Sequence, residues 1–209
     1  MENEESQNLT AEENILAAAR RVFSRAGYEG ARMQEIADEA GVNKALLHYY
    51  FRSKSQLFDA IFSDAFKSFW PVLEPKFVDG TTSMKEIIWL AVNGYMDILM
   101  KMPYLPTLIV GELNRSPEKV ESLFKMAGVR PEIIVGAIQK GIENGEVYSI
   151  EPRDLVLNVL GMLISPFLSE PLLAKMFFSS PIEFNEFLER RRKTLYQFIC
   201  RGVLVNPEI

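Results

Sequence analysis

The stretch Met33–Lys54, MQEIADEAGVNKALLHYYFRSK, constrains the fold of this chain more than any other segment. In its first half, Ile36 and Ala40 are four residues apart, the spacing of one face of a short helix. Gly41 predicts the end of that helix, because glycine adopts a left-handed backbone at no steric cost. Asn43 is a good N-cap for a second helix. The segment therefore predicts two short helices joined by a tight turn.

The second of these helices has an apolar face and an outward face. Leu47, Tyr50 and Phe51 recur at i, i+3 and i+4 and are predicted to face the interior. The residues left facing outward are Lys44, Ala45, His48 and Tyr49. A helix–turn–helix that holds a short helix at the surface has the shape that enters the DNA major groove.

This segment resembles the TetR family of bacterial transcriptional regulators. The resemblance is carried by the IleAla-x-x-AlaGlyVal pattern at 36–42, by Asn43-Lys44, and then by Leu47, Tyr50-Phe51 and Ser53-Lys54. The chain departs from the family where Ala45-Leu46-Leu47-His48 replaces the usual Gly-Thr-Leu-Tyr, and where Arg32 replaces a Thr. The resemblance implies an all-α homodimer that binds an operator in double-stranded DNA and carries a small-molecule cavity beyond the DNA-binding part.

The charge distribution agrees with a DNA-binding segment. The whole chain carries a net charge of −5, yet Ala18–Lys54 holds seven basic residues against four acidic ones, a local excess of three. Contact with phosphates needs such a local basic surface rather than a basic protein. The predicted DNA-contacting residues are Arg32, Gln34, Asn43, Lys44, Ala45, Leu46, His48, Tyr49 and Lys54.

Several of these residues have an ordinary structural explanation as well. Lys44 and Lys54 either contact phosphates or are simply solvated charges. Leu46 either packs internally or touches a thymine methyl group. His48 is the only histidine, and nothing near it supplies two further metal ligands, so a phosphate or a base edge is its expected partner. No metal site and no cofactor is predicted.

Local signals divide the chain into three parts. Residues 1–9 are predicted to be a flexible acidic arm. Thr10 and Glu13 are the cap and first-turn acid of a helix that ends at Gly27, so residues 10–53 form a three-helix DNA-binding domain. Residues 54–209 form a helical ligand-binding and dimerisation domain. An aromatic helix over 53–70, ending before Pro71, joins the two domains without a Gly/Ser linker.

Beyond Gly80 the pattern is helical throughout, without a credible alternating strand. Proline and glycine residues separate the helices, and Asn144-Gly145 is interpreted as a helix C-cap rather than a hairpin turn. The predicted helices cover 83–102, 107–113, 117–127, 131–144, 152–168 and 181–199. The predicted fold is all-α with about nine helices in total.

Aromatic and methionine side chains recur along the middle of the chain. At helical spacing such residues usually form plain core, but methionines and bulky rings grouped with proline kinks suit an adaptable pocket. The sequence favours a pocket for a largely apolar small molecule, with Asn93, Asp97, Glu112 and Asn114 as polar groups able to orient it. The predicted lining residues are Phe62, Phe66, Trp70, Trp89, Asn93, Tyr95, Met96, Leu99, Tyr104, Leu108, Glu112, Phe124, Met162 and Phe167.

The last two long helices carry more apolar surface than the exterior of a monomer normally shows. Burial in the core is one explanation, and pairing across a symmetry axis is the other, which we favour because helix–turn–helix proteins commonly act as dimers. The predicted interface residues are Leu155, Val159, Met162, Phe184, Phe187, Leu188, Leu195 and Phe198.

Other classes of protein fit less well. The acidic N-terminus lacks an apolar signal segment, and the apolar run Leu155–Leu168 is too short to span a bilayer, so we expect a cytoplasmic protein without membrane contact. Cys200 is the only cysteine, which excludes an internal disulfide. No phosphate-binding loop or nucleophile motif indicates an enzyme.

Two functions remain for the sequence. The first is a ligand-responsive regulator, a repressor by default with activation possible, in which the 53–70 helix transmits ligand binding to the DNA-binding domain. The second is a helical carrier for an apolar ligand, with a merely structural helix–turn–helix. The net negative charge favours neutral or cationic ligands over anionic ones. Binding to the DNA upstream of its own gene would discriminate between the two functions.

Overall fold

A computed structural model describes residues 10–207, and over that range the chain is all-α with twelve helices. Within the same range β structure is limited to one isolated bridge, between Val147 and Leu204. The predicted fold class is confirmed. The arm predicted at residues 1–9 lies outside the described residues.

The chain forms two compact units, and the division between them falls after Asp64. That division lies inside helix α4 (Lys54–Lys67), so no loop separates the units. The domain boundary predicted after residue 53 places all of α4 in the second domain, and it stays a prediction.

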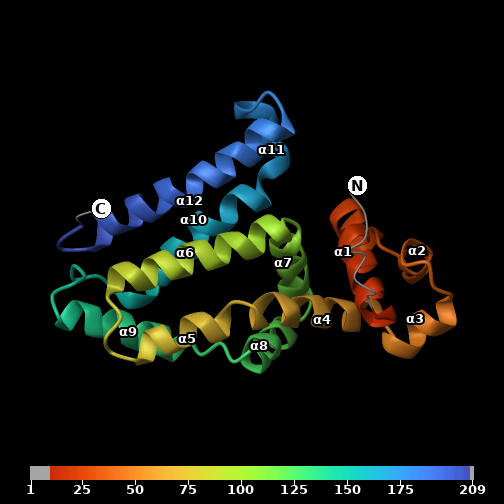
Figure 1. Ribbon diagram of the computed structural model, residues 1–209, viewed down its shortest axis with the longest axis horizontal. Coiled ribbons are helices and arrows are strands. Elements are labelled where there is room, and N and C mark those ends of the chain that lie inside the picture. Colours follow the sequence, from red (N-terminus) through yellow and green to blue (C-terminus); the bar gives the residue numbers. More distant parts are fainter. Residues whose placement is uncertain (1–9, 208–209) are drawn as a thin grey trace, which may run out of the picture. The chain divides into compact units, whose positions relative to one another are not determined.

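The first unit contains three complete helices, which the sequence defines locally, and the part of α4 up to Asp64. The complete helices are α1 (Ala11–Gly30), α2 (Met33–Glu39) and α3 (Lys44–Tyr50), drawn in red to orange in Figure 1. Thr10 and Glu13 form a reciprocal capping box at the start of α1, as predicted. Fully buried side chains from all three helices, including Phe23, Ile36 and Leu47, make the core of this unit.

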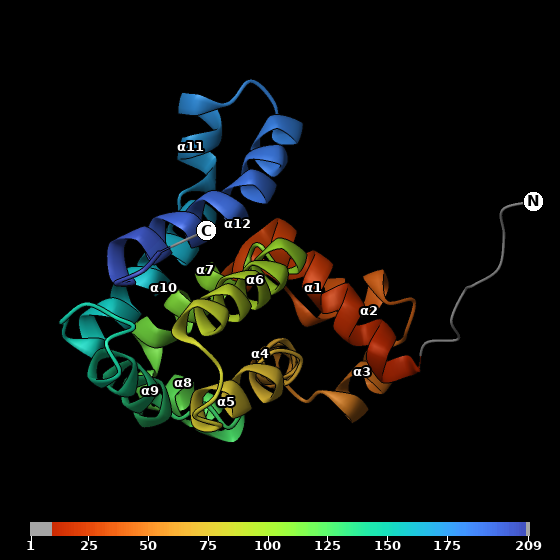
Figure 2. The same ribbon diagram turned by 60° about the vertical axis from the view of Figure 1, so that its left-hand side comes forward.

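The second unit contains the remaining helices. They are α5 (Trp70–Val78), α6 (Met84–Lys101), α7 (Leu105–Arg115), α8 (Pro117–Met126), α9 (Pro131–Glu143), α10 (Pro152–Leu168), α11 (Glu170–Phe177) and α12 (Pro181–Val203). Helix α6 packs against α5, α10 and α12, and α10 also packs against α7 and α9 (Figure 2). Val92, Met96 and Leu99 of α6 are almost fully buried in this core.

The count of about nine helices was too low, and the prolines explain the error. Pro71 was interpreted as the end of an aromatic helix, but it occupies the first turn of α5. Pro106 and Pro171 likewise stand in the first turns of α7 and α11. Proline is tolerated there because the first helical N–H groups have no intrahelical acceptor. Each proline therefore begins a new helix directly after the previous one ends.

Two further local predictions concern the C-terminal half. Asn144 is the C-cap of α9 and Gly145 has φ +72°, so the helix ending is confirmed in place of a hairpin. Between residues 10 and 207, no single helix has both the length and the apolar character needed to cross a membrane. Helices α10 and α11 have this length and apolar character only when they are taken together, and the pair is bent by 73°.

Candidate nucleic-acid interface and internal cavity

The turn between α2 and α3 is closed by backbone hydrogen bonds. Gly41 has φ +67°, its N–H donates to the carbonyl of Asp38 at 3.1 Å, and the N–H of Val42 donates to Ala37 at 3.0 Å. This pair of bonds is the Schellman arrangement, which depends on a residue that tolerates the left-handed region. Gly41 therefore fixes where α2 ends, as the sequence predicted, and the direction in which the chain enters α3.

Helix α3 is held at both of its ends. The Oδ1 of Asn43 accepts a hydrogen bond from the N–H of Leu46 at 2.8 Å, which confirms the predicted N-cap. Leu47 is fully buried and Phe51 is nearly so. Tyr50 was predicted to face inward and does not: its side chain is exposed, in edge-to-face contact with the exposed ring of Tyr49 at 5.2 Å. The outer surface of α3 therefore carries two adjacent tyrosines.

The predicted DNA-contacting residues fall into two groups. Leu46, His48 and Lys54 are partly buried. The exposed group is Arg32, Gln34, Asn43, Lys44, Ala45 and Tyr49. Within the exposed group, the side-chain amide of Gln34 donates to Asp38 at 2.8 Å. The DNA contacts themselves stay predictions.

Ion pairs engage three of the seven basic residues in this segment. Arg21 pairs with Glu39 at 2.7 Å and Arg25 with Glu35 at 2.8 Å, so these contacts tie α1 to α2. Arg20 pairs with Asp64 in the same unit. The cations of this segment that are exposed and have no side-chain partner within the described residues are Arg32, Lys44 and Arg52. Arg52 was absent from the predicted contacts, although its position two residues after α3 was a usable signal.

Lys54 has an internal role that the sequence does not reveal. Its Nζ donates to the carbonyl oxygens of Tyr28 at 2.5 Å, Ala31 at 3.1 Å and Glu29 at 3.3 Å. It also lies 4.6 Å from the centre of the Tyr28 ring. Burial lowers the pKa of the ammonium group. Lys54 thus joins the first turn of α4 to the C-terminal end of α1.

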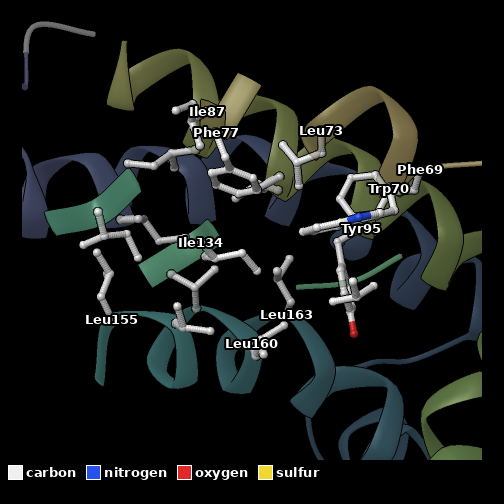
Figure 3. Close-up of a pocket in the computed structure, with 18 of the residues that line it drawn as sticks. Phe69, Trp70, Leu73, Phe77, Ile87, Tyr95, Ile134, Leu155, Leu160 and Leu163 are labelled. Carbon is white, nitrogen blue, oxygen red and sulfur yellow. The ribbon is translucent and has the colours of Figure 1, made fainter. Parts of the chain in front are cut away.

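The second unit contains a cavity of about 210 Å³ that is partly open to the surface (Figure 3). Its walls come mainly from α5, α6, α9 and α10 and are almost entirely carbon. Trp70 and Tyr95 contribute the polar atoms closest to this space. The hydroxyl of Tyr95 points away from Trp70 in Figure 3, and burial raises the pKa of Tyr95 to about 12. An uncharged, largely apolar molecule suits such walls, because an unpaired charge there would lose its hydration.

Some predicted pocket residues line this cavity and most do not. Phe66, Trp70, Tyr95 and Phe124 are in the wall, and the Phe66 and Phe124 rings meet edge to face at 5.0 Å. The predicted residues that the cavity wall does not include are Phe62, Trp89, Asn93, Met96, Leu99, Tyr104, Leu108, Glu112, Met162 and Phe167. Their ligand contacts stay predictions.

The residues outside the wall have identifiable structural roles. Met96, Leu99, Leu108 and Phe167 are buried core. Glu112 is 6% exposed and pairs with Arg115 at 2.7 Å and Lys119 at 3.2 Å. Trp89 lies at the surface with its ring against Tyr196, and Phe62 belongs to the first unit.

Sequence reasoning missed several wall residues because it missed α5. Once Pro71 is interpreted as a helix end, Leu73 and Phe77 fall in a loop and lose their helical spacing. The helix places both in the cavity wall, together with Trp70 one turn earlier. Proline near a helix start, followed by apolar residues at i+2 and i+6, was the available signal.

The predicted dimer residues also divide by exposure. Leu155, Phe184, Leu188 and Leu195 are buried in the core of the unit itself. Val159, Met162 and Phe187 are half-buried, and Phe198 is 67% exposed. Leu157 of α10 is a further large apolar residue that points outward, also 67% exposed, and the sequence prediction missed it. The dimer contact itself stays a prediction.

Metal chemistry has no visible support in the described part of the chain. No group of three or more His, Cys, Asp or Glu side chains there is arranged to hold an ion. Cys200 is buried, and burial raises the pKa of its thiol.

The capped turn and the exposed α3 form a helix–turn–helix, an architecture used by DNA-binding transcriptional regulators. A model of the bacterial regulatory proteins of the tetR family matches residues 15–61, the segment that contains most of α1, all of α2 and α3, and the start of α4. These matches support an assignment to the TetR family of transcriptional regulators.

Individual relatives agree with this assignment. The chain is 26% identical over 159 residues to the HTH-type transcriptional repressor NicS of Pseudomonas putida, covering 73% of this chain and 71% of NicS. It is 49% identical to the transcriptional regulator RutR of Escherichia coli K12 over 47 residues, 22% of each chain. The structure of the regulator FadR from Bacillus subtilis in complex with stearoyl-CoA superposes with a TM-score of 0.66 at 18% identity, covering 89% of this chain and 96% of FadR. Both named sequence relatives are regulators rather than enzymes.

Proposed function

We propose that this protein is a cytoplasmic, ligand-responsive repressor that binds a pseudo-palindromic operator as a homodimer. The observation that carries this proposal is the outward face of α3. Lys44, Ala45 and Tyr49 are exposed on a helix whose start is capped by Asn43 and whose entry is fixed by the turn at Gly41. A short, fixed helix with an exposed polar face can present side chains to base edges in the major groove.

The charges around α3 suit contact with the sugar–phosphate backbone. Arg32 precedes α2, Lys44 begins α3 and Arg52 follows it, so the cations lie at the ends of the two short helices. Phosphate contacts at such positions fix the register of a reading helix, while base contacts specify the sequence. In a dimer, two copies of α3 would address half-sites whose centres are roughly 34–36 Å apart, or farther on deformed DNA.

The outer faces of α10 and α12 support a dimer. Leu157 and Phe198 are large apolar side chains, each 67% exposed. Gly161 lies one turn beyond Leu157, and a Cβ placed on it would meet nothing within 4 Å, so a partner helix can approach closely there. Pairing α10 and α12 with their symmetry mates would remove this apolar surface from water.

The cavity supports an apolar effector. A cavity of about 150 Å³ lined by leucine, isoleucine and phenylalanine can bind benzene, and the cavity here is larger, at about 210 Å³. Phe66 lies in the last turn of α4 and in the cavity wall, whereas Lys54 begins α4 in the first unit. A ligand that displaces the wall would therefore move the helix that carries the DNA-binding unit. A ligand that lowers DNA affinity tenfold must itself bind tenfold more weakly to the DNA-bound protein.

A gel-shift titration with the DNA upstream of the gene tests the reading helix. The Lys44→Ala, His48→Ala double variant should lose specific binding while its circular dichroism spectrum is unchanged. Lys125→Ala is the matched control, because Lys125 is an exposed lysine paired with Glu121 in the second unit. Unchanged operator affinity in the double variant would refute the assignment of α3. A wild-type protein that binds no DNA at moderate salt would favour the apolar-ligand carrier instead.

Sedimentation velocity tests the dimer. Leu157→Asp with Phe198→Asp should convert a dimer at micromolar concentration into a monomer, because burying these unpaired charges costs several kcal/mol, on the order of 3–5. Val110→Asp, at an exposed apolar position on α7, is the control and should leave the dimer intact. A wild-type monomer under these conditions would contradict the dimer and the two-half-site operator.

A further inference from the structure

The internal cavity and a surface groove have two wall residues in common. The groove lies between α5 and α6, has a volume of about 330 Å³, and includes Phe69 and Leu73 in its wall. The same two residues line the cavity, and Figure 3 labels both at its edge. The cavity and the groove therefore meet at Phe69 and Leu73.

The Phe69 ring rests directly on the backbone of α6. A Cβ built on Gly94 would lie 2.2 Å from the Cε2 atom of this ring, so the ring occupies the place where any other residue would have its side chain. The ring also meets Tyr95 edge to face at 6.2 Å. Phe69 is only half-buried and lies at the break between α4 and α5. The Phe69 ring is thus one of the two side chains that border both spaces.

The groove differs from the cavity in its charges. Asp97 lies in the groove wall, but Arg192 of α12 pairs with it at 2.6 Å and compensates its charge. Lys101 lies in the same wall, is exposed, and has no side-chain partner among residues 10–207. Arg192 also lies 3.9 Å from Glu189, so the two acidic residues share one arginine, and Lys101 is the charged residue of the groove wall that stays without a side-chain partner in the described range.

A second groove also borders the cavity, on the opposite side. It lies between α10 and α12 and shares Leu155, Val159 and Ile199 with the cavity wall. Its wall includes Phe198, which belongs to the proposed dimer face. A partner subunit would cover this groove, whereas the α5–α6 groove includes no residue of the proposed dimer face.

We propose that the cavity and the α5–α6 groove together bind a single-chain amphiphile with an anionic head. The hydrocarbon chain occupies the carbon-lined cavity and passes between Phe69 and Leu73, and the head group remains in the groove beside Lys101. This inference rests on the proposed function of the cavity as the effector site. The anionic head differs from the neutral or cationic ligand that the net negative charge of the chain favours. A charge close to the ligand acts on it more strongly than charges farther away than a Debye length.

Three ten-carbon probes that differ only in the head group test this assignment. Binding of n-decanoate, n-decanol and n-decyltrimethylammonium below their micelle concentrations is measured on the full-length protein by calorimetry. We expect decanoate to bind about tenfold more tightly than decyltrimethylammonium, in line with charges a few ångströms apart near a protein surface. Lys101→Glu should invert this preference and leave decanol within twofold. Lys125→Glu, the same charge reversal elsewhere on the surface, should change nothing.

The route is tested by the rate of association. Phe69→Ala removes the ring that borders both spaces, so the association rate constants of all three probes should rise in stopped-flow fluorescence. Leu163→Trp fills the cavity from α10 and should abolish binding of all three probes, with melting temperature as the check on folding. Unchanged association rates in Phe69→Ala would overturn the route past Phe69.

The remaining outcomes separate this inference from the function on which it rests. If decanol binds the wild-type protein and Leu163→Trp prevents it, but head charge and Lys101→Glu make no difference, the anionic head site is wrong and the effector cavity stands. If the wild-type protein binds none of the probes, the effector cavity and the amphiphile assignment are both wrong.

Discussion

Replacing Lys54 with methionine separates two roles for this residue that the sequence does not distinguish. As a phosphate contact, Lys54 would contribute to DNA binding and little to folding. The structure instead has its ammonium group donating to the carbonyls of Tyr28, Glu29 and Ala31. Lys54→Met keeps the apolar stem on the Tyr28 ring and removes only the charge and the donors. We expect it to lower the free energy of unfolding without changing the electrostatics of DNA binding.

The magnitude follows from the three acceptors. A hydrogen bond from a charged donor contributes about 1.5–3 kcal/mol when its partner is buried, and a cation over an exposed ring adds about 0.5–1 kcal/mol. The Lys54 site is only partly buried, and water can reach the freed carbonyls. Because solvent screens this site, we expect Lys54→Met to lower the free energy of unfolding by about 2 kcal/mol, which covers the three hydrogen bonds and the ring contact together.

Two measurements on the same variants decide between the roles. Urea unfolding followed by circular dichroism should show a lower midpoint for Lys54→Met. The salt dependence of binding to a non-specific duplex should be unchanged. Arg52→Met is the matched control, because Arg52 is exposed and unpaired: its unfolding free energy should stay within about 0.5 kcal/mol, while its salt slope should fall by about 0.9. A lower salt slope with an unchanged urea midpoint in Lys54→Met would refute the internal role.

Three further predictions use single contacts. Asn43→Ala removes the α3 cap and should lower the unfolding free energy by about 1 kcal/mol in the same urea assay. Gly94→Ala should cost about 1–3 kcal/mol by overpacking against Phe69, and an unchanged melting temperature would show that the ring moves freely. Asp79 accepts a hydrogen bond from the Thr82 hydroxyl and further ones from the backbone N–H groups of Thr82 and Thr81. These bonds, the hydroxyl first, lower the pKa of the Asp79 carboxyl from its ordinary 3.8 to about 2. The free energy by which this lowered pKa stabilises the fold is fully present above pH 3.8 and is lost as the pH falls through about 2. In Thr82→Ala, the midpoint of the Asp79 carboxyl titration followed by carbon-13 NMR should return towards 3.8.

The sequence by itself determined the features that depend on neighbours in the chain. The glycine turn before α3, the Asn43 cap, the Thr10 capping box and the C-cap at Gly145 all involve contacts within six residues. Glycine and capping residues act through their own backbone conformation and through adjacent N–H groups, so their identity and spacing are sufficient evidence. For the same reason the helix–turn–helix and the all-α class could be predicted before the structure.

Only the tertiary structure decided which side chains meet across the fold. Arg21 and Arg25 look like free cations in the sequence, but α2 places acidic partners beside them. Lys54 looks like a phosphate contact, but its ammonium group donates to backbone carbonyls at the C-terminal end of α1. The cavity arises from two pairs of helices, α5–α6 and α9–α10, that are separated in the chain, and a single misinterpreted proline at Pro71 was enough to hide one wall of it. Such contacts depend on how whole helices pack, and helical spacing in one segment carries no record of its partner.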